Sequence, residues 1–136
     1  MRTFLDTNVF LDAVGRAHPE REACARLLQR VAEGSLEAIV NTEVVQEILY
    51  VLTRRGQRQA ALELSRHIEA LFPDMLPVTR EDMNEALRLL EAHPGLSVRD
   101  SVHAATMRRN GLRMIVSVDP DFDRIPGIHR IAPQAV

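Results

Sequence analysis

The stretch MIVSVDPDFD, residues 114–123, joins an apolar run directly to a cluster of acids. Residues 114–118 predict a buried strand, because a short run of β-branched and other apolar side chains next to turn residues is typical of one. Asp119, Asp121 and Asp123 follow that strand at once. In open parallel sheets ligands bind beyond the carboxyl ends of the strands, so these acids mark a candidate binding site.

Outward from this strand, other short apolar runs alternate with longer segments of helical periodicity. Strands are predicted over residues 3–5, 38–40 and 75–78, with a last extended piece around 129–131. The third run contains Pro77, which cannot donate to a sheet ladder, so we expect it at an edge of the sheet. Apolar residues at helical spacing, with capping and terminating residues, predict helices over 9–14, 19–34, 42–56, 61–72, 79–94 and 97–111.

The alternation of short strands with longer helices predicts an α/β fold. Its central sheet is expected to be mostly parallel and covered by helices on both faces. The 136 residues are near the commonest size of one domain, and no repeat, linker or low-complexity tract divides them. We therefore expect residues 1–136 to form a single domain with its own hydrophobic core.

Composition argues against several classes of protein. Hydrophobic residues make up 46% and charged residues 26% of the chain, which is ordinary for a globular protein. No apolar run approaches the roughly 18 residues of a membrane helix, and the first residues lack the apolar segment of a signal peptide. We expect a cytoplasmic protein with no membrane partner. The only cysteine, Cys24, excludes an intrachain disulfide and a zinc site with two thiolates.

The basic residues are unusual, because all 17 are arginine. The absence of lysine argues against P-loop proteins, Schiff-base enzymes and receiver-type domains that form a phosphoryl-aspartate. The formal net charge of −2 argues against a general nucleic-acid binder with a basic surface. Two arginine groups are candidates for phosphate contacts, although solvated helix ends would explain them too. They are Arg54, Arg55 and Arg58, and Arg108, Arg109 and Arg113.

Further acids stand near the ends of other predicted elements. Asp6 ends the first strand, Asp100 opens the helix before residues 114–118, and Glu47 lies more than one turn into the helix after the second strand. If the first strand is central, all these regions open at the same edge of the sheet. Facing carboxylates suit hard divalent cations such as Mg²⁺ and Mn²⁺. Phosphodiester hydrolysis fits such a site, because it needs no lysine, cysteine or catalytic histidine.

Each of these acids also has a purely structural explanation. Asp6 and Asp100 suit helix N-termini, and the acids within 119–123 suit a solvated turn. Glu47 is harder to explain in this way, because apolar residues flank it. Glu43, one turn earlier, is either an alternative ligand or a residue that stabilises the start of the helix. The functional interpretation therefore depends on the conjunction of the acids and on their order.

Four motifs in this order resemble the PIN-domain family, specifically the VapC-type toxins of toxin–antitoxin pairs. The motifs are FLDTNV at 4–9, TEVVQEI at 42–48, RDSVHAA at 99–105 and SVDPDFD at 117–123. Each motif is short, but together they extend over nearly the whole chain. The resemblance implies a three-layer α/β/α PIN-like fold and an endoribonuclease that depends on Mg²⁺ or Mn²⁺.

The resemblance also implies roles for the individual acids. By position, Asp6 and Asp100 are the principal metal ligands. Glu47 and Asp119 complete an acidic quartet that holds the metal and carries catalysis. Asp123 would support a second metal through water.

Several neighbouring residues match the family pattern or depart from it. Thr7 and Asn8 match the residues beside the first acid, which hold the geometry of the site. Ser117 stands where many of these toxins have threonine, and it keeps the hydroxyl. Pro120 replaces a basic residue, removes an N–H and stiffens the turn. His103, at i+3 from the second principal acid, has the spacing of a second metal ligand, although the family's position usually packs in the interior.

The resemblance finally implies partners. They are an RNA substrate, a cognate antitoxin protein whose tail reaches the acidic site, and a second copy of the chain. The apolar faces of the helices within 42–72 are the expected dimer surface, although the same residues would serve as core in a monomer. With no Trp, one Tyr and four Phe, stacking on unpaired bases is expected to be sparse. Two alternatives stay open, namely a catalytically inactive PIN-fold scaffold and a housekeeping nuclease of the same fold.

Overall fold

A four-stranded parallel sheet forms the centre of the molecule in the computed structural model, which describes residues 2–15 and 19–136. The strands lie in the order β2-β1-β3-β4, so β1 has a neighbouring strand on each side, which is the condition for the acids to meet at one edge. All pairs between named strands are parallel, and Phe4 of β1 lies between Ile39 and Ile115 of its two neighbours. The strands are β1 (Thr3–Leu5), β2 (Ala38–Ile39), β3 (Met114–Val116) and β4 (His129–Ile131).

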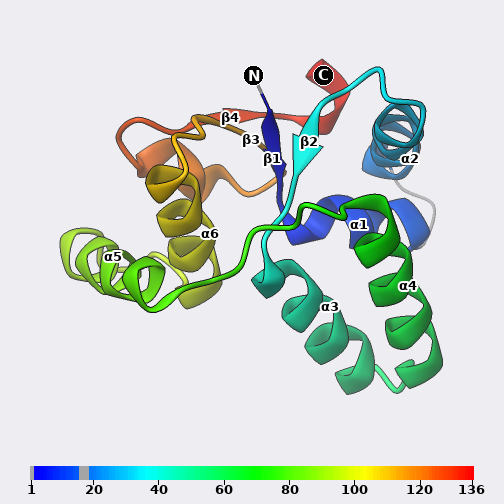
Figure 1. Ribbon diagram of the computed structural model, residues 1–136, viewed down its shortest axis with the longest axis horizontal. Helices are drawn as coiled ribbons and strands as arrows, with labels where there is room; N and C mark the ends of the chain where they lie inside the picture. The colour runs from blue at the N-terminus through cyan, green and yellow to red at the C-terminus, as the bar shows by residue number, and fades with distance from the viewer. Residues whose placement is uncertain (1, 16–18) are drawn as a thin grey trace.

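Helices cover both faces of this sheet, which confirms the predicted three-layer α/β/α arrangement. Helices α5 and α6 lie on one side and α1 and α2 on the other, while α3 and α4 form a hairpin beyond the carboxyl ends of β1 and β2 (Figure 1). None of the helices in the described ranges is long and apolar enough to cross a membrane. The α-helices are α1 (Thr7–Val14), α2 (Pro19–Ala32), α3 (Thr42–Arg54), α4 (Arg58–Leu71), α5 (Arg80–Ala92) and α6 (Val98–Arg109), and the 3₁₀ helices are η1 (Pro120–Arg124) and η2 (Pro133–Ala135).

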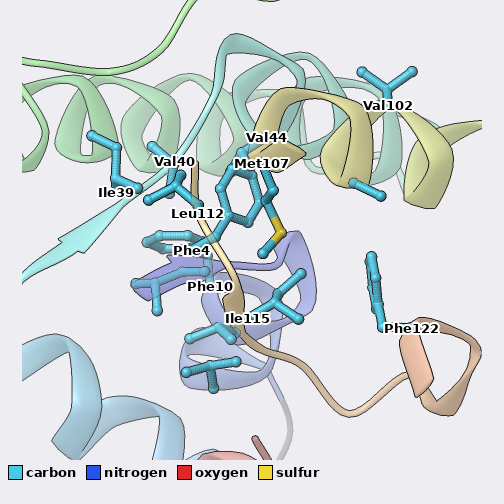
Figure 2. Packing of buried hydrophobic residues seen from close by; sticks show 14 of the residues in the cluster. Phe4, Phe10, Ile39, Val40, Val44, Val102, Met107, Leu112, Ile115 and Phe122 are labelled. Carbon is cyan, nitrogen blue, oxygen red and sulfur yellow. The ribbon is translucent and has the colours of Figure 1, made fainter. Parts of the chain in front are cut away.

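The core sits between the sheet and the helices on each side. Figure 2 shows Phe4, Phe10 and Ile115 in one cluster of buried side chains, with Phe122 contributed by η1. Each of these four side chains is at most 1% exposed. Burying an aromatic or branched apolar side chain stabilises a fold by about 1.5–3 kcal/mol, so these contacts hold β1 and β3 against the helices.

The segment at 75–78 does not form the predicted edge strand, and this prediction was wrong. Only one isolated parallel bridge joins Leu76 to Asn41. Pro77 has no N–H to continue a ladder, and the N–H of Val78 donates to the Thr42 hydroxyl instead. The predicted strand over 114–118 is also shorter than expected, because β3 ends at Val116 and the chain then turns toward η1.

Side-chain caps stand at the starts of α3, α5 and α6. Asn41 caps α3 by accepting the N–H of Val44 at 3.2 Å. Thr79 and Asp82 form the reciprocal capping box of α5, and Ser97 caps α6. These side chains accept N–H groups that the first helical turn leaves without partners, and they determine where each helix begins.

A buried polar network joins α3, α5 and α6. The Asn41 amide donates to Thr106 Oγ1 at 2.9 Å, and the Thr106 hydroxyl faces Val102 O at 3.1 Å and Asp82 Oδ2 at 3.4 Å. Arg109 closes the network through an ion pair of 3.1 Å with Asp82. The network holds the start of α3 against the middle of α6. Helix α3 follows β2, and the first turn of α6 carries Asp100.

Thr106 is the residue on which this network depends. We expect Thr106→Val to lower the free energy of unfolding by about 1–3 kcal/mol, because the nearly isosteric valine leaves the buried Asn41 amide without an acceptor. Thr106→Ser keeps the hydroxyl and should lose only about 1 kcal/mol, from the missing methyl group. Urea denaturation followed by circular dichroism measures both variants. Equal stability of wild type and Thr106→Val would contradict this account.

Candidate active site

Acidic side chains converge at the carboxyl edge of the sheet because four elements begin there. Asp6 follows β1 and caps α1, and Asp119 follows β3 and caps η1. Asp100 lies in the first turn of α6, and Glu47 lies in the second turn of α3. Parallel strands direct their carboxyl ends to one edge, so residues far apart in sequence meet there.

The carboxylate of Asp6 is the most heavily hydrogen-bonded acid of this edge. It is 4% exposed, and its Oδ1 accepts the N–H of Thr7 at 2.8 Å. Its Oδ2 accepts the Ser117 hydroxyl at 2.6 Å and the Asn8 amide at 3.2 Å. These three donors hold the Asp6 carboxylate in one orientation, and the supporting role of Thr7, Asn8 and Ser117 in the site stays a prediction.

Ser117 connects Asp6 to the acidic turn after β3. Its hydroxyl donates to Asp6 and accepts the N–H of Asp119 at 3.0 Å. Asp119 in turn accepts the N–H of Asp121 at 2.9 Å. Pro120 is the first residue of η1, where a missing N–H costs nothing, so its departure from the family pattern is accommodated by the helix start.

Glu47 is held on the other side of Asp6 by residues of α1 and α6. The Thr7 hydroxyl donates to Glu47 Oε1 at 2.8 Å, and His103 Nε2 lies 3.3 Å from the same oxygen. The second oxygen, Oε2, lies 3.5 Å from Arg99 Nη1. His103 Nε2 is also 3.7 Å from Asp6 Oδ1, so one buried imidazole faces both acids.

A second group of acids is formed by Asp100, Asp119 and Asp121. Each offers one carboxylate oxygen, and these oxygens lie within 4.8 Å of one another. Asp100 is 7% exposed, and its Oδ2 is buried with no hydrogen-bond partner among the described residues. An acceptor buried without a donor, beside two further carboxylates, fits a hard divalent cation, because such ions take oxygen ligands.

Charge crowding shifts the acids of the site in different directions. Burial, a hydrogen bond with Asp119, and the like charges of Asp6 and Asp119 raise the pKa of Asp100 to about 9. Burial also raises the pKa of Asp6, although His103 and Ser117 oppose the change. Asp100 is therefore protonated at neutral pH unless a cation compensates its charge.

Glu47 behaves differently from Asp6 and Asp100. Burial alone would raise its pKa, but the hydrogen bonds from His103 and Thr7 and the nearby charge of Arg99 outweigh burial and lower the pKa. Burial raises the pKa of Glu43, one turn earlier, and this residue is only half-buried. Glu47 thus keeps its charge more readily than Asp6 or Asp100, whose pKa values are raised.

The structure brings Asp6, Glu47, Asp100 and Asp119 to the same edge of the sheet, but it places Asp123 differently. Asp123 accepts two hydrogen bonds of 3.0 Å from the guanidinium of Arg130, and its side chain is half-exposed. Asp121 occupies the position beside Asp100 instead. The catalytic and ligand roles of all these residues stay predictions.

The sequence placed Asp121 in the candidate acidic run without giving it an individual role, and it did not single out Arg99. Asp121 stands in the same acidic run as Asp119, and its separate role depends on the turn of η1, which no periodicity reveals. Arg99 precedes Asp100 directly, but only the fold brings it to Glu47. His103 was noted for its spacing from Asp100, and its burial beside Asp6 and Glu47 is a property of the tertiary structure.

Three of the six arginines considered for phosphate contacts have structural partners within the chain. Arg108 donates to Glu85 and to the carbonyl of Pro126, and Arg109 pairs with Asp82. The guanidinium of Arg54 lies over the ring of Tyr50, 5.6 Å from its centroid. The helix-end interpretation therefore accounts for these three side chains.

The raised pKa of Asp100 predicts a pH dependence of stability in the metal-free protein. The folded protein keeps the Asp100 proton up to about pH 9, whereas the unfolded chain releases it near pH 3.8. The stability that this raised pKa contributes is therefore complete below pH 3.8 and is lost as the pH rises toward about 9. Asn mimics the protonated acid at every pH. We expect Asp100→Asn to gain stability relative to wild type as the pH rises from 5 to 9 in EDTA, measured by chemical denaturation. A stability difference that does not change with pH would refute the assignment.

Sequence comparisons identify the family. Residues 3–128 match the sequence model of the PIN domain. Ribonuclease VapC13 of Mycobacterium tuberculosis is 31% identical over 128 residues, which make up 94% of this chain and 98% of that protein.

Solved structures share the fold at lower sequence identity. VapC20 of Mycobacterium tuberculosis, described as a sarcin–ricin loop cleaving toxin, superimposes with a TM-score of 0.74 at 20% identity, covering 90% of this chain and 93% of that chain. A toxin–antitoxin complex from Klebsiella pneumoniae superimposes with a TM-score of 0.68 at 17% identity, covering 98% and 99%. The parallel sheet, the acids at its carboxyl edge and the sequence match thus lead to one conclusion: this chain belongs to the PIN-domain family, where its relatives include VapC ribonucleases.

Proposed function

We propose that this protein is an endoribonuclease that depends on Mg²⁺ or Mn²⁺ and hydrolyses phosphodiester bonds in RNA. The observation that carries the proposal is the buried, unpartnered Oδ2 of Asp100 beside the carboxylates of Asp119 and Asp121. A ribonuclease is favoured over other phosphodiesterases because the relative VapC13 is named as one.

The four acids Asp6, Glu47, Asp100 and Asp119 would hold the cation, with Asp121 as a further oxygen donor. When bound, a divalent cation supplies positive charge that polarises the scissile phosphate and activates water for attack. Mg²⁺ and Mn²⁺ suit a site made only of carboxylate oxygens, whereas softer metals prefer nitrogen and sulfur ligands.

Hydrogen bonds from neighbouring residues orient the carboxylates of this site. Ser117, Asn8 and the N–H of Thr7 hold the Asp6 carboxylate in place. The Thr7 hydroxyl holds one oxygen of Glu47. Such donors to a ligating carboxylate reduce the reorganisation that cation binding would otherwise require.

Arg99 is suited to contact the RNA backbone. Its side chain is 47% exposed, and it lies beside Glu47 at the start of α6. A guanidinium presents a planar fork of donors that matches phosphate oxygens. With few aromatic residues in the chain, we expect binding through phosphate contacts more than through base stacking.

We further propose that the ribonuclease is the toxin of a toxin–antitoxin pair, and that residues 1–136 act as one domain. The family resemblance supports a cognate antitoxin that covers the acidic edge, and the similar fold in a toxin–antitoxin complex is consistent with it. A homodimer belongs to the same proposal, but not through the apolar stripes of α3 and α4 that the sequence suggested, because Val44, Ile48 and Ile68 are 0% exposed and form part of the core. Sedimentation of the chain with and without its co-expressed neighbouring gene product tests both assemblies.

Cleavage of an RNA pool by the purified protein tests the ribonuclease. We expect cleavage with Mn²⁺ or Mg²⁺, none with EDTA, and a loss of at least about 100-fold in Asp6→Asn and in Asp100→Asn, because each removes a ligand worth several kcal/mol in the transition state. The products are resolved on denaturing gels.

Asp74→Asn is the matched control for these variants. Asp74 is exposed and pairs with Arg2, before the amino end of β1, so this variant should keep full activity. Cleavage that survives in both Asp6→Asn and Asp100→Asn would overturn the proposal. A folded wild type that binds neither cation would instead favour the inactive scaffold.

A further inference from the structure

His103 is a fully buried imidazole in the middle of the acidic edge. It is 0% exposed, and its ring packs on Phe4 with the centroids 5.3 Å apart. Nδ1 has no hydrogen-bond partner in the part of the chain that the structure describes. Nε2 lies 3.3 Å from both Thr7 Oγ1 and Glu47 Oε1.

These contacts decide which ring nitrogen carries the hydrogen. The Thr7 hydroxyl already donates its hydrogen to Glu47 Oε1 at 2.8 Å. Both oxygens near Nε2 can therefore only accept, and Nε2 must be the donor. A hydrogen on Nδ1 would be a buried donor without an acceptor, which is unfavourable. The network thus selects the tautomer with its hydrogen on Nε2.

The two donors constrain Glu47 in a specific way. Thr7 and His103 both donate to Oε1, so that oxygen is held inside the fold. The other oxygen, Oε2, faces the partly exposed Arg99 at 3.5 Å. A glutamate has several rotamers open to it, and without these donors the carboxylate could rotate away from the site.

We propose that His103 is a positioning residue whose Nε2–H fixes Glu47, so that Oε2 is the oxygen presented to the cation and to the substrate. The inference rests on the proposed cation-dependent ribonuclease and goes beyond it, by giving His103 a role other than that of a metal ligand. Nε2 is occupied by Glu47 and Thr7, and Nδ1 is enclosed by the core, so neither nitrogen is available to coordinate.

Two substitutions separate the hydrogen bond from the packing. His103→Leu fills much of the space but has no donor, whereas His103→Gln places an amide N–H near the position of Nε2. We expect the dissociation constant for Mn²⁺, measured by calorimetry, to rise about 10–100-fold in His103→Leu, as is usual when a donor to a ligand is lost. His103→Gln should recover most of the affinity, and kcat/KM for RNA should follow the same order.

A double-mutant cycle with Glu47→Gln distinguishes positioning from a general packing role. If His103 acts through Glu47, adding His103→Leu to Glu47→Gln should weaken Mn²⁺ binding no further. Thermal denaturation in EDTA shows whether each variant is folded. If His103→Leu does not fold, Thr7→Val replaces it in the cycle, because it removes the other donor to the same oxygen.

If the wild type binds Mn²⁺ and cleaves RNA, several results would overturn this inference and leave the proposed function standing. They are unchanged affinity in His103→Leu, affinity in His103→Gln as weak as in the leucine variant, and additive losses in the cycle. Nitrogen hyperfine coupling in the electron paramagnetic resonance of bound Mn²⁺ would also overturn it, because it would make His103 a direct ligand. A wild type that binds no Mn²⁺ would overturn the proposed function, and this inference with it.

Discussion

The burial of the Asp6 carboxylate at the end of the central strand is the constraint on which the rest of the site depends. A buried carboxylate is tolerated only when donors surround it. The donors to Asp6 come from its own helix start, through Thr7 and Asn8, and from the turn after β3, through Ser117. The same serine accepts the N–H of Asp119, so satisfying one acid also positions another. The strand order brings these segments together, because β1 lies directly beside β3.

Acids at the same edge of the sheet have pKa values shifted in opposite directions. Asp100 has few compensating donors and a raised pKa, whereas Glu47 is held by Thr7 and His103 and has a lowered pKa. A folded protein that keeps such acids together is stabilised by a cation that neutralises them, since binding to the native state alone shifts the folding equilibrium. Under the proposed function, cation binding would couple activity and stability at this edge. The polar network through Thr106 holds α3 and α6 in the orientation that keeps Glu47 beside His103.

Much of the fold was predictable from local patterns, and the failures have identifiable causes. The strand at 75–78 was predicted from its apolar run, but Pro77 and the Thr42 hydroxyl limit it to one bridge. In the acidic run after β3, Asp121 lies beside Asp100 while Asp123 pairs with Arg130. The alternation of acidic and other residues over 119–123 cannot distinguish these two acids, because the turn of η1 and the register of β4 decide which one faces the site. The contacts of His103 likewise depend on the packing of α6 against β1.

The sequence by itself determined most of the helices and strands and the residues that cap them. It also determined the order of the acidic motifs along the chain and the family to which those motifs belong. These features are local, because periodicity, capping chemistry and short motifs depend on residues close together in the chain. Only the tertiary structure decided which oxygen of each acid is held and which is left without a donor, and which protons the buried groups carry. Those properties arise from residues 40 to 111 positions apart, such as Thr7 with Glu47 and Asp6 with Ser117. Burial and the sum of nearby charges act through space, and the order of residues along the chain does not contain them directly.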